Sequence, residues 1–540
     1  MVRRRVGLTV MLALLIIGVL LSVLPWHAGA IRLAGVSVTW WYAVALAPGV
    51  AVLVRLIVGT PAPVRALASW VAPALFVSVA MQIFVAAPAA PLVALAAILA
   101  PMMAGCVRAR AAGSLPRFLA VGILSAAGTL VACANFLVAT DLARGVGLER
   151  WHGLLLAAPI ALVLAWRGGS RWRQPVLVGS VGLLAIAVVA VAVATGVTPW
   201  RAWTRLASRP VVAFDESSVW VTQGRTLSTP TSVTLTEAQR MTATSIAMWR
   251  VVPGDDGNGS ALEWRLVPGD SLALRSGDQV LLPAGAGVRF ESGRRVPGAP
   301  ISGVAWADAT ASSALDGLLA AAGAVVTLVG GGLTLLASPS ASKTSVRSHV
   351  ALLATASVVI VAVCWGVYAA DVGADLALGV PAATAFMRLP SVAVSGAWGG
   401  ALEVVTAVAI TGLLMTAVTT LADRVADAWS IGSTRHASAL RAAVVAAGAL
   451  VALVPTTAWN ALMLGLGLAA AGLGPTLVDA PPPLRLMASV TGAVAVVSLA
   501  LADPWLSPIA PALSAYPALL AIPLAAGAGW MAAARRADVT

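Results

Sequence analysis

The sequence is poor in charged residues and in the side chains that most catalytic and metal sites use. Charged residues make up 10% of its 540 residues, and it has 4 histidines and 3 cysteines. The cysteines, Cys106, Cys133 and Cys364, lie in apolar segments without CxxC spacing, which argues against a disulfide framework or a metal site. Nucleophile-elbow, P-loop, HExxH and CxxCH patterns are absent. We therefore expect no cofactor and no metal, and we favour a protein that is not an enzyme.

The scarcity of charge also excludes a soluble protein of this length. Hydrophobic residues make up 60% of the chain, and the mean hydropathy is +0.94. This composition predicts a polytopic α-helical membrane protein whose first partner is the lipid bilayer. The formal net charge of +13 is carried mainly by arginines between the apolar runs, so we expect no binding to nucleic acid.

Apolar runs occur in two blocks, residues 1–198 and residues 314–540. The runs of the first block are 6–24, 36–54, 67–87, 91–107, 118–139, 151–166 and 175–197, and those of the second are 315–337, 349–370, 392–421, 439–458, 461–477, 486–501 and 511–534. Because about 20 apolar residues cross a bilayer, we predict about 14 transmembrane helices in a 7+7 arrangement. The first run precedes Ala28-Gly29-Ala30 and resembles a signal peptide, but its length favours an uncleaved helix.

The basic residues give these helices an orientation. With the N-terminus inside, the inner loops contain Arg3, Arg4, Arg5, Arg55, Arg65, Arg108, Arg110, Arg117, Arg167, Arg171, Arg173, Lys343, Arg347, Arg424, Arg435, Arg441, Arg485, Arg535 and Arg536. The short outer loops contain only Arg32, Arg144, Arg150 and Arg388. The positive-inside rule then predicts that both termini are cytoplasmic and that residues 199–313 are extracytoplasmic. The richness in arginine and alanine is typical of a bacterial protein, so we expect the bacterial cytoplasmic (inner) membrane.

Residues 199–313 interrupt the apolar pattern and predict an all-β domain between the two membrane blocks. Short alternating runs are separated by tight turns, and Trp249-Arg-Val-Val-Pro-Gly-Asp recurs as Trp264-Arg-Leu-Val-Pro-Gly-Asp. Proline and glycine in these turns supply the backbone angles that a hairpin needs. We predict that Trp220, Trp249 and Trp264 contribute to the core of this domain.

One acidic residue, Glu403, stands deep in an apolar run. Gly396 and Gly400 form a GxxxG pair, and Glu403 follows Gly396 by seven residues, so all three would share one face of a helix. This predicts a carboxylate in a close helix contact or a cavity rather than in lipid. Such a group is either a proton- or substrate-linked site or an interhelical hydrogen bond that fixes packing.

Two functions fit these features. In the first, the chain is a non-catalytic membrane subunit or assembly factor of a larger complex, and residues 199–313 dock another membrane or periplasmic protein. The scarcity of intramembrane charge favours this function. In the second, the chain is a transporter or flippase for a hydrophobic or lipid-linked substrate, with Glu403 as a buried titratable site and an inverted repeat of the two blocks.

Overall fold

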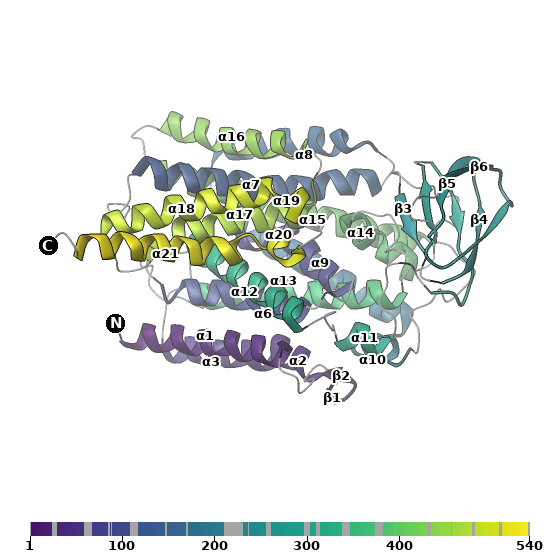
Figure 1. The fold of residues 1–540 in the computed structure, drawn as a ribbon, viewed down its shortest axis with the longest axis horizontal. Helices are drawn as coiled ribbons and strands as arrows, with labels where there is room; N and C mark the ends of the chain where they lie inside the picture. The colour runs from purple at the N-terminus through teal and green to yellow at the C-terminus, as the bar shows by residue number, and fades with distance from the viewer. Residues whose placement is uncertain are drawn as a thin grey trace.

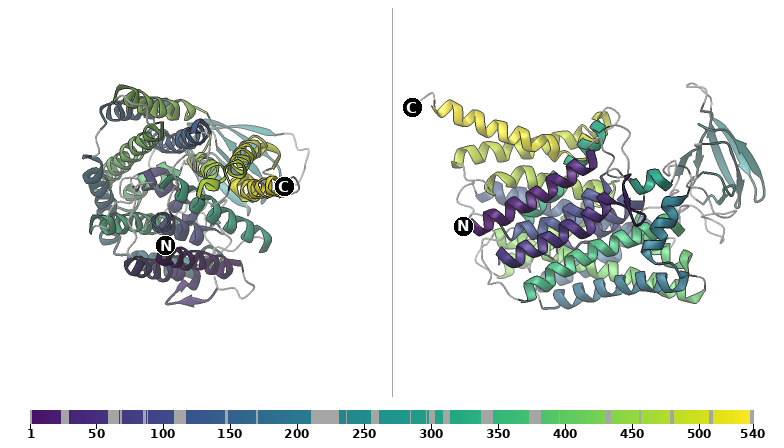
Figure 2. Two further views of the ribbon diagram at one scale, coloured as in Figure 1. Left: turned by 90° about the vertical axis from the view of Figure 1, so that its left-hand side faces the viewer. Right: turned by 90° about the horizontal axis from the view of Figure 1, so that it is seen from below.

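The computed structural model describes residues 2–23, 30–58, 67, 69–84, 87, 89–107, 117–145, 148–168, 171–209, 231–235, 237–254, 261–283, 285–295, 297, 303–308, 314–336, 346–372, 382–394, 396–429, 434–454, 456–477, 481–506 and 510–537. Most of them form a bundle of helices that run roughly along one direction (Figure 1). The start of α1 and the end of α21 lie at one end of this bundle, and the largest group of strands lies beyond its other end (Figures 1 and 2).

The first block of the chain contains helices of very different lengths. They are α1 (Val2–Val23), α2 (Val38–Trp41), the π-helix η1 (Tyr42–Leu46), α3 (Ala47–Val58), α5 (Pro73–Phe84), α6 (Ala90–Ala104), α7 (Arg117–Gly145), α8 (Arg150–Arg167) and α9 (Arg173–Thr195). The antiparallel strands β1 (Arg32–Leu33) and β2 (Val36–Ser37) form a hairpin before α2. Thus α2, η1 and α3 together make one nearly continuous helix.

The second block has the same character. It contains α12 (Ala314–Leu336), α13 (Val346–Val372), α14 (Ala382–Ala393), α15 (Ala397–Trp429), α16 (Thr434–Val451), α17 (Ala458–Leu473), the 3-10 helix η4 (Gly474–Leu477), α18 (Pro482–Leu501), α19 (Asp503–Leu506), α20 (Pro511–Ala515) and α21 (Ala518–Ala537). Each of the fourteen apolar runs therefore contains a helix.

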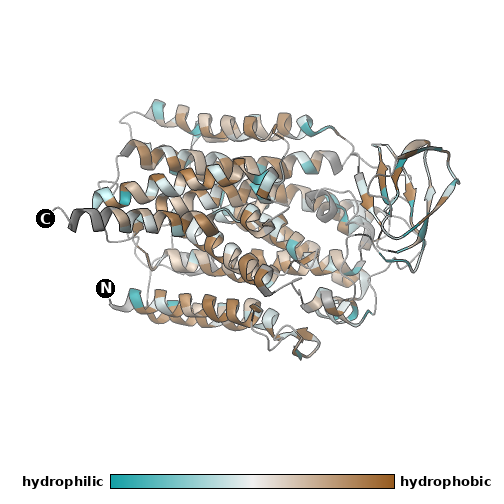
Figure 3. Ribbon diagram, in the orientation of Figure 1, coloured by the Kyte–Doolittle hydropathy of each residue, from teal (hydrophilic) through white to brown (hydrophobic). Residues whose placement is uncertain are grey.

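In the described part of the chain, eight helical segments are long and apolar enough to cross a membrane. Five further apolar helices, α5, α6, α13, α16 and α21, contribute shorter apolar stretches of 10–17 residues in the described part of the chain. Hydrophobic residues cover the helices along most of their length, and hydrophilic residues gather at helix ends and in the strands (Figure 3). Lipid can solvate such helices on their outer faces because every backbone hydrogen bond is made within the helix. The chain is a helical membrane protein.

The centre of the bundle is formed by helices that are buried on all sides. All fifteen residues of α6 are buried, and most of α17 is buried as well. The helix α12 packs against both. A β-carbon at Gly331 would lie 2.7 Å from the backbone oxygen of Leu466, so only glycine allows α12 and α17 to approach so closely. Small residues of this kind replace the hydrophobic effect, which does not drive helices together in lipid.

The region between the blocks contains two antiparallel sheets. The strands β3 (Thr231–Thr234), β8 (Gln279–Leu282), β5 (Ala247–Val252) and β6 (Leu262–Leu266) form one sheet in this order, and β7 (Ser271–Leu274), β4 (Gln239–Ala243) and β9 (Val288–Arg289) form the other. Trp249 is fully buried between them, together with Met241 and Val280. The carboxylate of Asp278 accepts hydrogen bonds from the backbone N–H groups of Gly254 and Arg275, at 3.2 and 2.7 Å, and so ties two turns together.

Two sequence predictions for this region need correction. Residues 199–313 are not all β, because α10 (Pro199–Ser208) and α11 (Gly303–Asp308) occupy their two ends. Trp264 is not a core residue, because β6 is an edge strand and leaves this side chain 45% exposed. Trp220 lies outside the described residues.

Candidate functional site

The predicted site at Glu403 has a different geometry from the one its sequence spacing suggests. Gly396 precedes α15 and has a positive φ of 76°, so it is not on the helix that carries Glu403. Gly400 is exposed, and a β-carbon there would meet nothing within 4 Å. The close approach is made instead at Gly399, where a β-carbon would lie 2.2 Å from the backbone oxygen of Val394. The three predicted residues are therefore not joined in one helix contact.

Glu403 itself is half-buried and lies in the second turn of α15. The described residues give its carboxylate no hydrogen bond and no ion pair. Glu403 is therefore near one end of α15 and not at the middle of the helix, where a membrane-embedded acid would cost most. A functional role for Glu403 remains a prediction.

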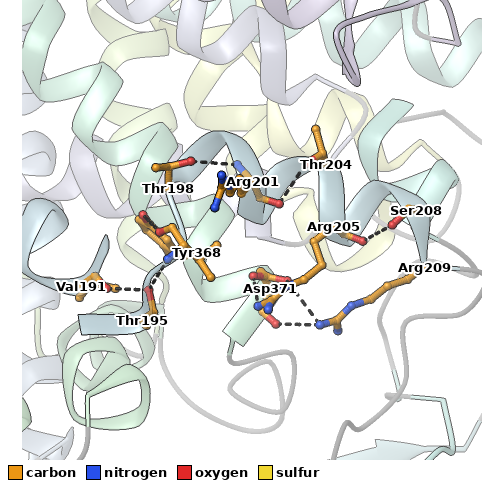
Figure 4. A network of polar contacts seen from close by, with 11 residues as sticks. Val191, Thr195, Thr198, Arg201, Thr204, Arg205, Ser208, Arg209, Tyr368 and Asp371 are labelled. Carbon is orange, nitrogen blue, oxygen red and sulfur yellow. Dashed lines mark hydrogen bonds and ion pairs between the residues drawn. The ribbon is translucent and has the colours of Figure 1, made fainter. Parts of the chain in front are cut away.

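Among the helical acids whose side chains the structure describes, the most deeply buried is Asp371, in the last turn of α13. Its side chain is 0% exposed, while those of its partners Arg205 and Arg209 are 50% and 16% exposed. The Nε atom of Arg205 donates to Oδ1 of Asp371 at 3.0 Å, and its Nη2 donates to Oδ2, which makes the pair bidentate. Arg209 donates through Nη2 to Oδ1 and to the backbone oxygen of Asp371, both at 3.3 Å (Figure 4). We refer to these three residues as the Asp371 network.

The Asp371 network holds the amphipathic helix α10 against α13. A proline opens α10 just after Thr198, whose hydroxyl caps the helix by accepting a hydrogen bond from the N–H of Arg201 at 3.3 Å. Next to the network, the Tyr368 hydroxyl donates to the backbone oxygen of Val197 at 2.7 Å. The turn between α9 and α10 and the C-terminal end of α10 are thus bonded to the same helix, α13.

Tryptophans attach the other side of α10. The rings of Trp203 and Trp40 are 5.1 Å apart in an edge-on arrangement, and those of Trp203 and Trp306 are 5.0 Å apart. Trp200 lies 5.0 Å from Trp41. Such rings are typical of membrane interfaces, where an apolar body and a polar N–H are both accommodated. The helix α10 is therefore a junction between α2, α11 and α13.

A second charge cluster lies at the other end of α9. Arg173, the first residue of α9, and Arg441 of α16 both pair with Asp423 of α15, and the Nε atom of Arg441 lies 2.6 Å from its Oδ1. Gly168 has a positive φ of 64°, and a β-carbon there would lie 2.8 Å from Nη1 of Arg441. Since α9 is 23 residues long, about 34 Å separates this Asp423 cluster from α10. Each cluster joins the first block or α10 to the second block.

The helix before α5 is broken inside the bundle. Residues 69–70 are helical, Val71 and Ala72 are not, and Pro73 starts α5. The side-chain oxygen of the buried Asn135 accepts a hydrogen bond from Ala74 N–H at 3.2 Å, which satisfies a donor at the helix start. The Trp70 indole donates to the backbone oxygen of Ala97 at 2.9 Å. Two small cavities flank the break, and both are lined by Trp70, Ala72 and Leu75.

Sequence reasoning missed these positions for identifiable reasons. Asp371 appeared to belong to an outer loop after its apolar run, and Asp423 follows the predicted end of its own run. Their partners are distant in the chain: Arg205 precedes Asp371 by 166 residues, and Arg173 precedes Asp423 by 250. The only available signal was that each acid follows the end of a long apolar run, residues 349–370 for Asp371 and residues 392–421 for Asp423.

Among the described residues there is no group of three or more histidine, cysteine, aspartate or glutamate residues that could hold a metal ion. No protein-family model matches the chain, and no curated protein matches it.

Proposed function

We propose that this protein is a non-catalytic membrane subunit or assembly factor of a larger bacterial inner-membrane complex, and that its stranded region docks a partner protein. The observation that carries this proposal is the distribution of buried charge. In the described helices the buried charged residues are Arg55, Arg173, Asp371 and Arg485, and each lies within the first or last four residues of its helix. Among the described residues, the middle of the bundle contains buried polar side chains such as Asn135 but no buried charged one.

This distribution suits a scaffold better than an ion-coupled carrier. Carriers place ionisable groups inside the membrane, where they bind and release ions. Here the charged groups connect helices to one another. The side chain of Arg55 donates to the backbone oxygen of Met102 at 2.7 Å, and Asp371 and Asp423 are both paired with arginines. A bundle whose helices are connected by ion pairs at both ends can hold the stranded region in a fixed position.

The proposal includes fourteen spans with both termini in the cytoplasm. The eight long helices, the five shorter apolar helices and α8, with its 18 residues, are fourteen helices. The start of α1 and the end of α21 share one end of the bundle, and the arginine-rich loops favour a cytoplasmic location for that end. The stranded region would then be extracytoplasmic.

Photocrosslinking in cells tests the docking role. A photoreactive residue replaces Met248, which is 49% exposed on β5, and a control replaces Leu156, which is 64% exposed on the lipid-facing side of α8. We expect a discrete protein adduct from position 248 only. Deleting this chain should also lower the abundance of the crosslinked protein's native complex. Equal adducts at both positions, or an unaffected complex, would contradict the proposal.

A transporter or flippase for a hydrophobic or lipid-linked substrate is the second candidate, and the helix break before α5 favours it. Discontinuous helices are common at transporter binding sites, and the adjoining cavities are almost wholly apolar. Replacing Ala72 with leucine would fill this space, whereas Gly122→Leu introduces the same leucine side chain where a β-carbon meets nothing within 4 Å. Loss of lipid flipping in proteoliposomes by the first variant alone would support this candidate, with Glu403 as its predicted titratable site.

A further inference from the structure

The strand β6 lies at one edge of the four-stranded sheet. It combines exposed apolar side chains with one acidic and one basic residue. The strand β6 is the last strand of its sheet, and in the described residues it pairs with β5 alone. Two large apolar side chains of this edge strand are open to solvent: Leu262 is 50% exposed and Trp264 is 45% exposed. Natural edge strands are normally protected by short length, bulges or inward charges, because an open edge is a template for another strand.

The sequence of β6 is complementary to itself when two copies run antiparallel. In Leu262-Glu263-Trp264-Arg265-Leu266, a two-fold axis at Trp264 places Glu263 opposite Arg265 of the second copy, and Arg265 opposite Glu263 of the second copy. The leucines at the two ends of the strand face each other in the same arrangement. Opposite charges on directly facing residues stabilise a strand pair, and like charges destabilise it.

The neighbouring registers lack this complementarity. A shift by two residues that keeps the same faces together would centre the axis on Glu263 or on Arg265, and either shift sets like charges against each other. A shift by one residue would place Leu262 and Trp264 of the second copy on the opposite face of the joined sheet from those of the first copy. The axis at Trp264 is thus the arrangement that satisfies both charge and burial.

We infer that a second copy of this chain occupies the free edge of β6, so that the two four-stranded sheets join into one through an antiparallel β6–β6 pair centred on Trp264. This inference rests on the proposed docking role of the stranded region and names the occupant of its edge. The sheets lie beyond the helices, so the bundle does not cover them (Figures 1 and 2). A closed two-fold contact of this kind ends with two copies and does not form fibres.

Charge exchange tests the contact in the full-length protein. The mass of the protein in lipid nanodiscs is measured for the wild type, for E263R, for R265E and for the double variant E263R/R265E. We expect a dimer for the wild type and about a tenfold or greater weakening of dimerisation in each single variant, because two symmetry-related pairs become repulsive. The double variant should restore the dimer, since the two charges have only changed places.

The double variant also separates the dimer contact from the fold of the sheet. Glu263 faces Arg250 within the same chain, so E263R introduces a repulsion that the second substitution does not remove. Recovery of the dimer therefore reports the contact between chains. A fold-related loss would instead persist in the double variant, and that result would overturn the inference.

Cysteine crosslinking tests the register independently. Facing residues of an antiparallel pair have Cα atoms about 4.5–5.5 Å apart, which suits a disulfide. Trp264→Cys should therefore form a dimer on oxidation, and Ser271→Cys, on the edge strand β7, should not. A monomeric wild type, or equal crosslinking of both variants, would refute the pairing. If the wild type is monomeric but the probe at Met248 still captures its partner, the docking role stands and this inference fails.

Discussion

Replacement of Asp371 should weaken the attachment of α10 to the helical bundle. The carboxylate is 0% exposed and receives bonds from both Arg205 and Arg209. In Asp371→Ala the two guanidinium groups keep their charge and lose the carboxylate that they share, whereas the bond from Arg209 to the backbone oxygen of residue 371 can persist. The Trp203 contacts to Trp40 and Trp306 do not involve the carboxylate and remain in the variant, so we expect α10 to detach transiently and not permanently.

The loss of free energy in Asp371→Ala depends on how exposed each arginine already is to water. Breaking a buried ion pair by removing one partner costs about 3–5 kcal/mol. Arg209 is 16% exposed and falls under this figure, whereas Arg205 is 50% exposed, so that its contribution is only about 0–1 kcal/mol. We therefore expect a loss of about 3 kcal/mol in the free energy that holds α10 in place, near the lower end of the range for a buried pair.

Thiol labelling measures this loss directly. Ala202 lies on the buried face of α10 with 0% exposure, so a cysteine there reacts with a maleimide only when the helix detaches. Because 1.4 kcal/mol is a factor of ten, 3 kcal/mol predicts labelling about 100-fold faster in Asp371→Ala than in the parent. The natural cysteines are replaced beforehand to remove background labelling.

Two companion variants test whether the lost ion pair causes the faster labelling. Asp371→Asn keeps an acceptor oxygen and loses the charge, so its labelling rate should be intermediate. Adding Arg209→Ala to Asp371→Ala removes the more buried of the two guanidinium charges that the carboxylate balanced, and it should slow labelling again. A change below about threefold in Asp371→Ala, which corresponds to less than about 0.7 kcal/mol, would refute the claim that the network fixes α10.

Three further predictions test other parts of the molecule. Asn135→Ala leaves the N–H of Ala74 without its acceptor and should cost about 1–3 kcal/mol, measured as a lower melting temperature in detergent against the parent. Glu403→Gln keeps the shape and removes the titratable proton, so abundance and melting should be unchanged; loss of growth or transport would then assign Glu403 a functional role, and a silent variant would argue against it. Alkaline phosphatase fused after Gly257 should be active and fused after Ser342 inactive, and the reverse pattern would contradict the proposed topology.

The positions of the helices could be predicted from the sequence because the bilayer imposes a simple rule. Each backbone polar group must be satisfied within the segment, so an apolar run of sufficient length becomes a helix whatever surrounds it. The strands β5 and β6 followed from alternation and from their repeated Pro-Gly-Asp turns in the same local way. These are properties of short stretches of chain.

The candidate sites could not be predicted because they depend on which helices become neighbours. A helix such as α6 is apolar on every face, so its sequence does not say which face meets which partner. Gly331, not Gly400, makes a close helix contact, because packing against Leu466 requires it.

The sequence by itself determined the membrane class, the two blocks and the polar region between them. Hydropathy and turn residues are properties of short stretches of chain. Only the tertiary structure decided that Asp371 is buried against Arg205 and Arg209, that Glu403 lies near the start of α15, and that Trp264 stands on an open edge. An acid's environment is set by side chains more than a hundred residues away, and an edge strand differs from a central one only by the neighbour it lacks.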